Sequence, residues 1–111
     1  MSNKNRPKVI TICGSMKFAE EQIRQVHRLE MEGNVVLQAI YLPPEMSGKG
    51  NPYTQEQEDL LDRNHKVKID LADAIFVVNV GGYTGTSTKS EIEYAEKTGK
   101  EIIWLEKPAA L

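Results

Sequence analysis

The sequence predicts an α/β fold, a three-layer Rossmann-like or flavodoxin-like parallel sheet of four to five strands flanked by helices. Two observations predict it. Short β-branched runs alternate with longer segments of helical periodicity, which is the pattern of a parallel sheet covered by helices on both faces. The chain has 111 residues, a length that suits one domain with one modest core. We therefore expect residues 1–111 to form a single domain.

The expected elements begin with a strand, a helix and a second strand. Lys8–Cys13 is rich in β-branched residues and is predicted to form the first strand. A helix is predicted over Met16–Glu32, ending at Gly33, since apolar residues recur there at steps of three and four. Asn34–Ile40 is predicted to be the second strand. The residues expected on the buried face of the helix are Ala19, Ile23, Val26 and Leu29.

The middle of the chain is expected to contain a long loop and a second helix. Tyr41–Thr54 is too long and too rich in proline and glycine for a tight connection, so we expect a mobile lid. Thr54 and Gln57 have the spacing of a capping box, which predicts a helix from there to about Leu71. The apolar residues at helical spacing along it are Leu60, Leu61, Val67 and Leu71.

The last part of the chain is predicted to hold the central strand of the sheet. Ala74–Val80 is almost continuously apolar, as is typical of a parallel strand buried on both faces. The glycine-rich loop Gly81–Thr86 follows, and then a helix over Ser87–Thr98 and a strand over Glu101–Leu105. Ligands bind such sheets beyond the carboxyl ends of the strands. The loops after the first strand and after Val80 therefore matter most.

Composition excludes several classes of protein. The net charge of -2 and the isoelectric point near 5.7 argue against a nucleic-acid polymer as partner. The longest purely apolar stretch, Ala74–Val78, is too short for a membrane span, and the polar start lacks the features of a secretory signal. A single cysteine favours a reducing cytoplasm. No spacing of histidine, cysteine and carboxylates resembles a metal site, so neither metal nor cofactor is expected.

The loop after the first strand is a candidate phosphate site. Gly14, Ser15 and Lys17 place a glycine, a hydroxyl and a cation where a helix begins, and helix N-termini bind anions. The alternative is a plain turn in which Ser15 caps the helix. Cys13, at the end of an apolar strand, is interpreted as buried filler rather than as a nucleophile.

The loop after Val80 carries the strongest local signal. The glycines let the backbone approach a ligand closely, and hydroxyl side chains gather at the start of the next helix. Glu91 is expected in the first turn of that helix as a nucleophile or base, but Thr88 and Glu91 also match a capping box, in which Glu91 only caps the backbone. The candidate binding residues of this loop are Gly81, Gly82, Tyr83, Ser87 and Ser90.

Three short motifs stand in order along the chain: Cys13-Gly14-Ser15, Ala72-Asp73, and the run from Ser90 to Ala95 followed by Gly99-Lys100. Together they resemble the nucleoside 2-deoxyribosyltransferase-like superfamily. The first is closest to the 2'-deoxynucleoside 5'-phosphate N-hydrolase branch. The resemblance implies that Glu91 attacks the anomeric carbon of a nucleotide and forms a glycosyl-enzyme. It also implies that Ser15, Lys17, Ser87 and Ser90 bind the 5'-phosphate.

The sequence departs from this family at three points. Thr11 stands where the family has a tyrosine, and His65 stands where it has an aspartate that orients the sugar. No aspartate precedes Glu91 in the glycine-rich loop, as one does in the transferases. His65 is therefore a second candidate catalytic residue, as a hydrogen-bonding or proton-handling group. Tyr41, Tyr53 and Tyr83 are candidates to stack on the base.

The function expected from these observations is hydrolysis of the N-glycosidic bond of a nucleoside 5'-monophosphate or a nucleoside, with release of free base. Three alternatives stay open: a deoxyribosyltransferase that exchanges bases, a non-catalytic nucleotide-binding or sensing module, and a small interaction domain. The expected partner is a small-molecule nucleotide or nucleoside. By analogy with the family, a homodimer is also expected.

Overall fold

The structure is a computed structural model, and it describes residues 6–108. Short 3-10 turns at Met16–Phe18, Pro44–Met46 and Val80–Gly82 separate the main elements. Within the described residues the strands and α-helices are β1 (Val9–Gly14), α1 (Ala19–Met31), β2 (Val35–Leu37), α2 (Gln55–Asp70), β3 (Ala74–Val78), α3 (Thr86–Lys97) and β4 (Glu101–Trp104).

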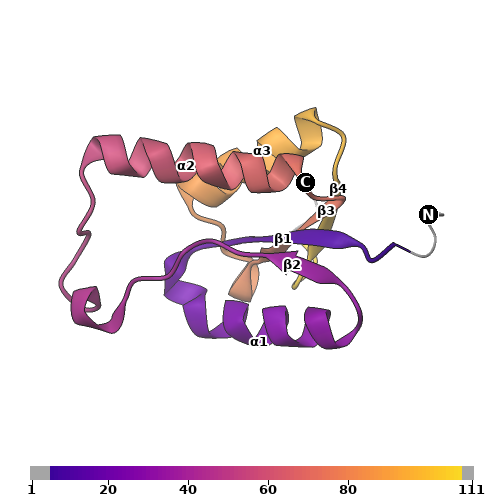
Figure 1. The fold of residues 1–111 in the computed structure, drawn as a ribbon, viewed down its shortest axis with the longest axis horizontal. Coiled ribbons are helices and arrows are strands. Elements are labelled where there is room, and N and C mark those ends of the chain that lie inside the picture. Colours follow the sequence, from indigo (N-terminus) through magenta and orange to yellow (C-terminus); the bar gives the residue numbers. More distant parts are fainter. Residues whose placement is uncertain (1–5, 109–111) are drawn as a thin grey trace.

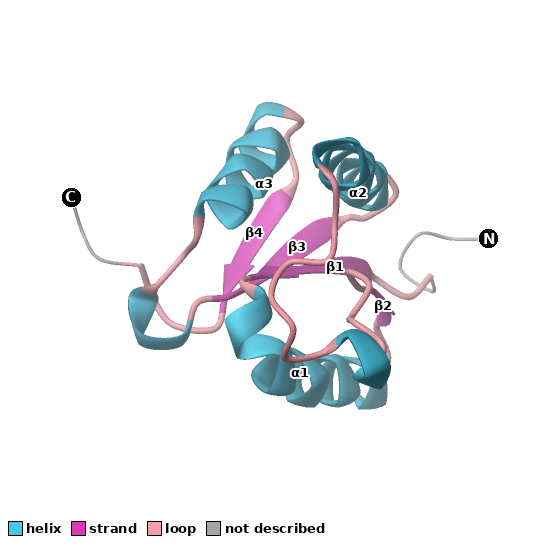
Figure 2. Cartoon of the chain, turned by 90° about the vertical axis from the view of Figure 1, so that its left-hand side faces the viewer, coloured by secondary structure: helices cyan, strands magenta, loops and turns pink. Residues whose placement is uncertain are grey.

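The strands of the described part form one parallel sheet of four strands in the order β2-β1-β3-β4. In its register Phe76 of β3 lies between Ile12 of β1 and Ile103 of β4. Helix α1 covers one face of the sheet, and α2 and α3 cover the other (Figures 1 and 2). The predicted Rossmann-like or flavodoxin-like fold with three layers is thus confirmed.

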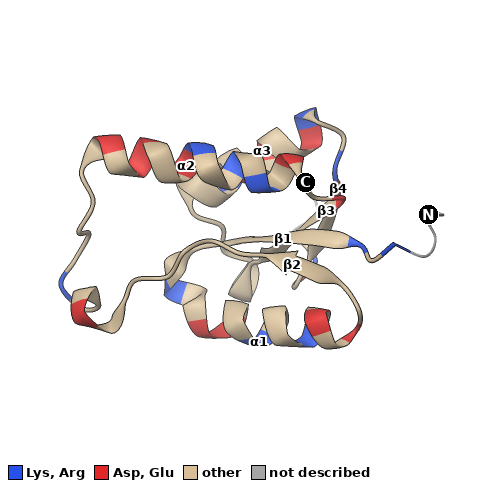
Figure 3. Ribbon diagram, viewed as in Figure 1, with Lys and Arg blue, Asp and Glu red and all other residues tan. Residues whose placement is uncertain are grey.

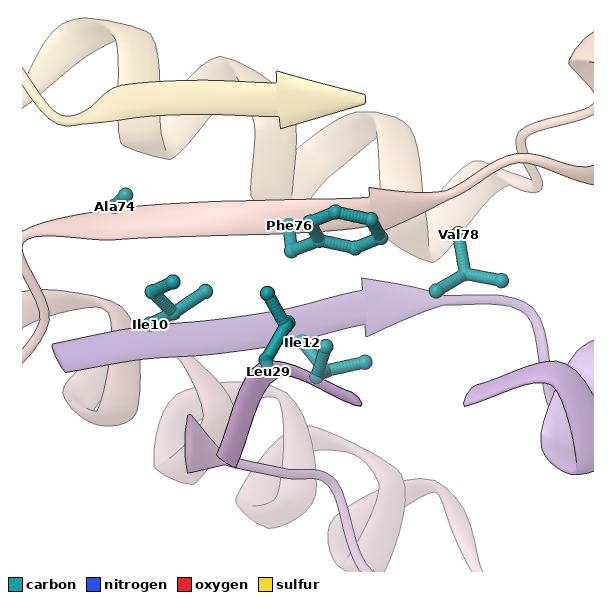
Figure 4. Packing of buried hydrophobic residues seen from close by; sticks show 6 residues of the cluster. All are labelled: Ile10, Ile12, Leu29, Ala74, Phe76 and Val78. Atoms are coloured by element: carbon teal, nitrogen blue, oxygen red, sulfur yellow. The ribbon is translucent and has the colours of Figure 1, made fainter. Parts of the chain in front are cut away.

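The core has one cluster of buried residues on each face of the sheet. All five residues of β3 are buried, which confirms the prediction of a central strand covered on both faces. The cluster toward α1, drawn in Figure 4, consists of Ile10, Ile12, Leu29, Ala74, Phe76 and Val78. The cluster toward α2 and α3 consists of Cys13, Ile69, Ile75, Val77 and Ala95.

The buried face of α1 differs from the prediction. Ile23 is 55% exposed, whereas its neighbour Gln22 is 1% exposed. The Gln22 side chain is satisfied by hydrogen bonds, because its Nε2 donates to the Ser15 carbonyl at 2.8 Å and its Oε1 accepts from the Tyr41 hydroxyl at 3.4 Å. Gln22, whose amide nitrogen and oxygen both have hydrogen-bond partners, is therefore buried on α1 where the apolar spacing predicted Ile23.

The buried face of α2 also differs from the prediction. Leu60, Val67 and Leu71 are exposed, and the buried residues of this helix are His65 and Ile69. Apolar spacing could not reveal this face because a polar side chain occupies its centre. Most acidic residues of α2 lie in its first half and its basic residues in its second half (Figure 3), with Asp70 at the end as the exception, and this arrangement mostly suits the helix dipole.

The predicted capping box at the start of α2 is confirmed. The Thr54 hydroxyl accepts from the Gln57 backbone N–H at 3.2 Å, and the Gln57 side chain accepts from the Thr54 N–H at 2.9 Å. We expect Thr54→Ala to lower the free energy of unfolding by about 1 kcal/mol, since one helix N–H loses its partner. Urea unfolding measures the change. Thr54→Ser keeps the hydroxyl and should match the unmodified protein; an equal loss in both variants would contradict this role of the hydroxyl.

Among residues 6–108, no helix combines the length and the apolar character needed to cross a membrane. The segment between β2 and α2, where a mobile lid is expected, holds one 3-10 turn and is otherwise irregular. Its mobility stays a prediction.

Candidate functional site

A cavity of about 850 Å³ lies beyond the carboxyl ends of β1 and β3. The chain passes from β1 to β2 on one side and later enters β3 on the other, so the strand order reverses between β1 and β3. The walls are formed by the loop after β1, parts of residues 39–53, one face of α2 and the start of α3. The segments that follow the first and third strands, which sequence reasoning singled out, therefore meet at one cavity.

Three reactive side chains from three different elements meet at this cavity. His65 Nε2 of α2 lies 3.6 Å from Glu91 Oε1 of α3 and 3.5 Å from Cys13 Sγ of β1. His65 and Glu91 line the cavity, and Cys13 lies behind them with 1% of its surface exposed. We call Cys13, His65 and Glu91 the central cluster.

The local structure explains why these residues converge. Alternation along β1 directs Thr11 and Cys13 toward α2 and α3. The Thr11 hydroxyl donates to the Lys68 carbonyl at 2.8 Å and so ties α2 to β1 one turn after His65. On α3, Glu91 follows the buried Thr88 by three residues and precedes the buried Ala95 by four, so it shares their face of the helix.

Burial sets the protonation states of the central cluster. It raises the pKa of Glu91 to about 7, with a hydrogen bond from Cys13 opposing and the Asp62 charge adding to the shift. Burial, with the Lys68 charge, lowers the pKa of His65 to about 4. The pKa of Cys13 is raised by burial and then by Glu91. At neutral pH the imidazole and the thiol are therefore uncharged, and Glu91 is the member that titrates.

The interpretation of Glu91 as a helix cap is wrong. Helix α3 begins at Thr86 with Gly85 as its N-cap, and its first turn contains no acidic residue. The chain is extended at Gly85 (φ −78°, ψ 176°) and helical from Thr86. Thr88 is therefore the third residue of the helix, not its N-cap, and its side chain is buried. Glu91 is consequently in the second turn, not in the expected first turn, and its side chain faces the central cluster.

The predicted residues of the first loop divide into two groups. Gly14 and Ser15 line the cavity. The Ser15 hydroxyl also accepts from the Lys17 N–H at 3.3 Å, so the capping role proposed for Ser15 is confirmed for the short turn Met16–Phe18. Among the described residues, Lys17 does not line the cavity. Its Nζ instead lies 3.7 Å from the centre of the Tyr83 ring.

The glycine-rich loop contributes less to the cavity than predicted. Of its candidate residues in the described chain, Ser87 lines the cavity, whereas Gly81, Gly82 and Tyr83 do not. The two glycines have positive φ and form the turn after β3, where Gly81 N–H donates to the Glu106 carboxylate. Ser90 lies on another face of α3, in a depression next to Lys66 and Tyr94.

Sequence reasoning missed Cys13 as a member of the site. Its place one residue before the loop Gly14-Ser15 was the available signal, because a strand's last residues approach the ligand edge of a parallel sheet. Asp62 and Lys68 of α2 also line the cavity. Of the three tyrosines predicted to stack on a base, Tyr53 lines the cavity. Within the described part of the chain, Tyr41 and Tyr83 do not line it.

The fold and the site together define an α/β protein with a buried carboxyl group, a neutral imidazole and a thiol at the switch point of a parallel sheet. Comparisons of the sequence with models of known protein families and with curated proteins found no match.

Proposed function

We propose that this protein cleaves the N-glycosidic bond of a nucleoside 5'-monophosphate or a nucleoside, with Glu91 as the nucleophile. The observation that carries the proposal is Glu91 itself, a buried carboxyl group at the wall of a cavity large enough for a nucleotide. Its raised pKa is typical of carboxyl groups that take part in chemistry. The resemblance of the sequence to the nucleoside 2-deoxyribosyltransferase-like superfamily assigns the same role to the same residue.

The reaction would proceed by double displacement. A carboxylate oxygen of Glu91 forms a bond to the anomeric carbon while the bond from that carbon to the base breaks. The base leaves with the electron pair of the broken bond and takes up a proton from solvent. Water then attacks the anomeric carbon, the carboxylate leaves with its electron pair, and the water loses a proton to solvent.

The remaining walls suit the other parts of a nucleotide. The first residues of α3 carry backbone N–H groups without partners inside the helix, and Ser87, Ser15 and Gly14 line the same cavity. This edge is where a 5'-phosphate would bind. Tyr53, Leu61 and Ile40 supply an aromatic and apolar wall for the base. His65, uncharged at neutral pH, would position the Glu91 carboxyl group through its Nε2.

The pKa of Glu91 predicts the pH dependence of the reaction. The nucleophile must be ionised, and burial raises its pKa to about 7, so the ionised fraction grows as pH rises through that value. We expect kcat/KM for base release to increase from about pH 6 to about pH 8 with a midpoint near the pKa. Initial rates with an unphosphorylated nucleoside measure this without titration of a phosphate. A rate that is flat or falls over this range would contradict the role of Glu91.

The proposal is tested by incubating the protein with ribo- and deoxyribonucleoside monophosphates and the corresponding nucleosides. Free base is followed by chromatography, and added free bases distinguish transfer from hydrolysis. Release of base would support the proposal and give the preferred sugar. A rise in melting temperature with a nucleotide, without base release, would instead support a binding or sensing module. The homodimer and the cytoplasmic location stay predictions, for which size-exclusion chromatography and cell fractionation are the measurements.

A further inference from the structure

Two of the three separations within the central cluster are those of a metal-ligand set. One ligand atom from each of Cys13, His65 and Glu91 lies within 4.8 Å of the others. In a tetrahedral zinc site with bonds of about 2.3 Å to sulfur and about 2.05 Å to nitrogen and oxygen, the sulfur–nitrogen edge is about 3.6 Å and the nitrogen–oxygen edge about 3.35 Å. The corresponding distances here are 3.5 Å for Cys13–His65 and 3.6 Å for His65–Glu91.

The chemical types of the three ligands select among metals. A thiolate and an imidazole suit Zn²⁺ and similar transition metals, whereas Mg²⁺ and Ca²⁺ require oxygen ligands. Three protein ligands with one open position are the arrangement of zinc sites that bind a water or a substrate. The open position here would face the cavity, since His65 and Glu91 line it and Cys13 closes the opposite side.

The imidazole is already in the orientation that a metal requires. Its Nε2 points toward both Cys13 Sγ and Glu91 Oε1. No large rearrangement of α2 is therefore needed for Nε2 to donate its lone pair to an ion.

We propose that Cys13, His65 and Glu91 form a binding site for Zn²⁺ whose fourth position opens into the cavity. On binding, the ion takes the place of the thiol proton, which passes to solvent, and the Glu91 carboxylate becomes a metal ligand. The ion would then compete with the anomeric carbon for this carboxylate. Zinc would thus inhibit the cleavage proposed above, an expectation that rests on that function, whereas metal binding itself does not.

Cobalt(II) titration of the untagged protein tests the site directly. Co²⁺ occupies zinc sites and gives visible bands characteristic of tetrahedral geometry, and a sulfur-to-cobalt charge-transfer band arises only when a thiolate binds. Cys13 is the single cysteine of the chain, so in monomeric protein this band can come from no other residue. We expect one Co²⁺ per chain with both spectral features, displaced by Zn²⁺. Absence of the charge-transfer band in the folded protein would overturn the proposal.

Matched variants separate this site from adventitious binding. Removing a residue that only hydrogen-bonds to a zinc ligand lowers metal affinity by about 10–100-fold. Because His65 would bind the metal directly, we expect His65→Gln to weaken Co²⁺ binding by about 100-fold or more. His27, on the exposed face of α1, is the only other histidine, and His27→Gln should leave the titration unchanged. Equal weakening in the two variants, or none in His65→Gln, would overturn the assignment. Circular dichroism shows whether each variant is folded.

The inhibition is tested separately by measuring base release with Zn²⁺ and after addition of EDTA. Inhibition that EDTA reverses would support competition for Glu91, and activity that requires zinc would overturn it. A protein that binds cobalt through Cys13 but releases no base would retain the metal site and refute the cleavage. A protein that releases base but shows no charge-transfer band from the thiolate would support the cleavage and refute the metal site.

Discussion

Glu91→Gln is expected to lower kcat for base release by about 10⁴-fold or more, the order observed when a nucleophile is removed from a covalent mechanism. Glutamine has the shape of the protonated acid but cannot form the glycosyl-enzyme. Because Glu91 is buried and partly protonated at neutral pH, the neutral amide should be tolerated at this position. Chromatography of the released base measures the loss.

Two comparisons make this result specific. The variant should still gain thermal stability with a nucleotide, since the walls of the cavity are intact. Glu93→Gln changes an exposed carboxylate on the same helix, outside the cavity lining, and should keep full activity. If Glu91→Gln released base at a rate near that of the unmodified protein, Glu91 would not be the nucleophile.

Phe76→Ala should produce the largest loss of stability, about 3–5 kcal/mol in the free energy of unfolding. Phe76 is 4% exposed in the central strand β3 and packs in the cluster between the sheet and α1 (Figure 4), with the Arg28 guanidinium 5.6 Å from its ring centre. Truncation removes most of the buried side chain and leaves a cavity. Since small domains have total stabilities of about 5–15 kcal/mol, urea unfolding should show a large shift of the midpoint.

Ile23→Ala is the matched control for this loss. Ile23 was predicted to be buried from its spacing but is 55% exposed in the structure. The variant should change the free energy of unfolding by no more than about 0.5 kcal/mol, as surface substitutions do. A loss comparable to that of Phe76→Ala would mean that Ile23 is buried in solution, for example against a second copy of the chain.

The sequence allowed the fold to be predicted because local patterns determined its main parts. Ala74–Val78 is apolar enough to identify the central strand, and the capping box at Thr54 marks the start of α2. The boundaries of the other elements differ from the prediction mainly at strand ends. There, a side chain's chemistry does not indicate where hydrogen bonding between strands stops.

The site could be predicted only in part. Glu91 was a candidate through its loop and through a resemblance, His65 through the resemblance alone, and Gly14, Ser15 and Ser87 through their loops; all five line the cavity. The contact of Cys13 with His65 joins residues 52 positions apart in the chain and depends on which face of α2 packs on β1. Periodicity favoured the faces with leucine and isoleucine. Gln22 and His65 are instead buried with polar partners on the packed faces, which apolar spacing does not reveal.

The single cysteine makes the central cluster accessible to isotope labelling. Protein prepared with carbon-13 at the cysteine β-carbon would give one protein resonance in a carbon NMR spectrum, because the chain contains no other cysteine. Cys13 touches His65 and interacts with Glu91, so the chemical shift of that one carbon would respond to changes in charge at its neighbours. A pH titration or the addition of a nucleotide could then be followed at the centre of the site in the unmodified sequence.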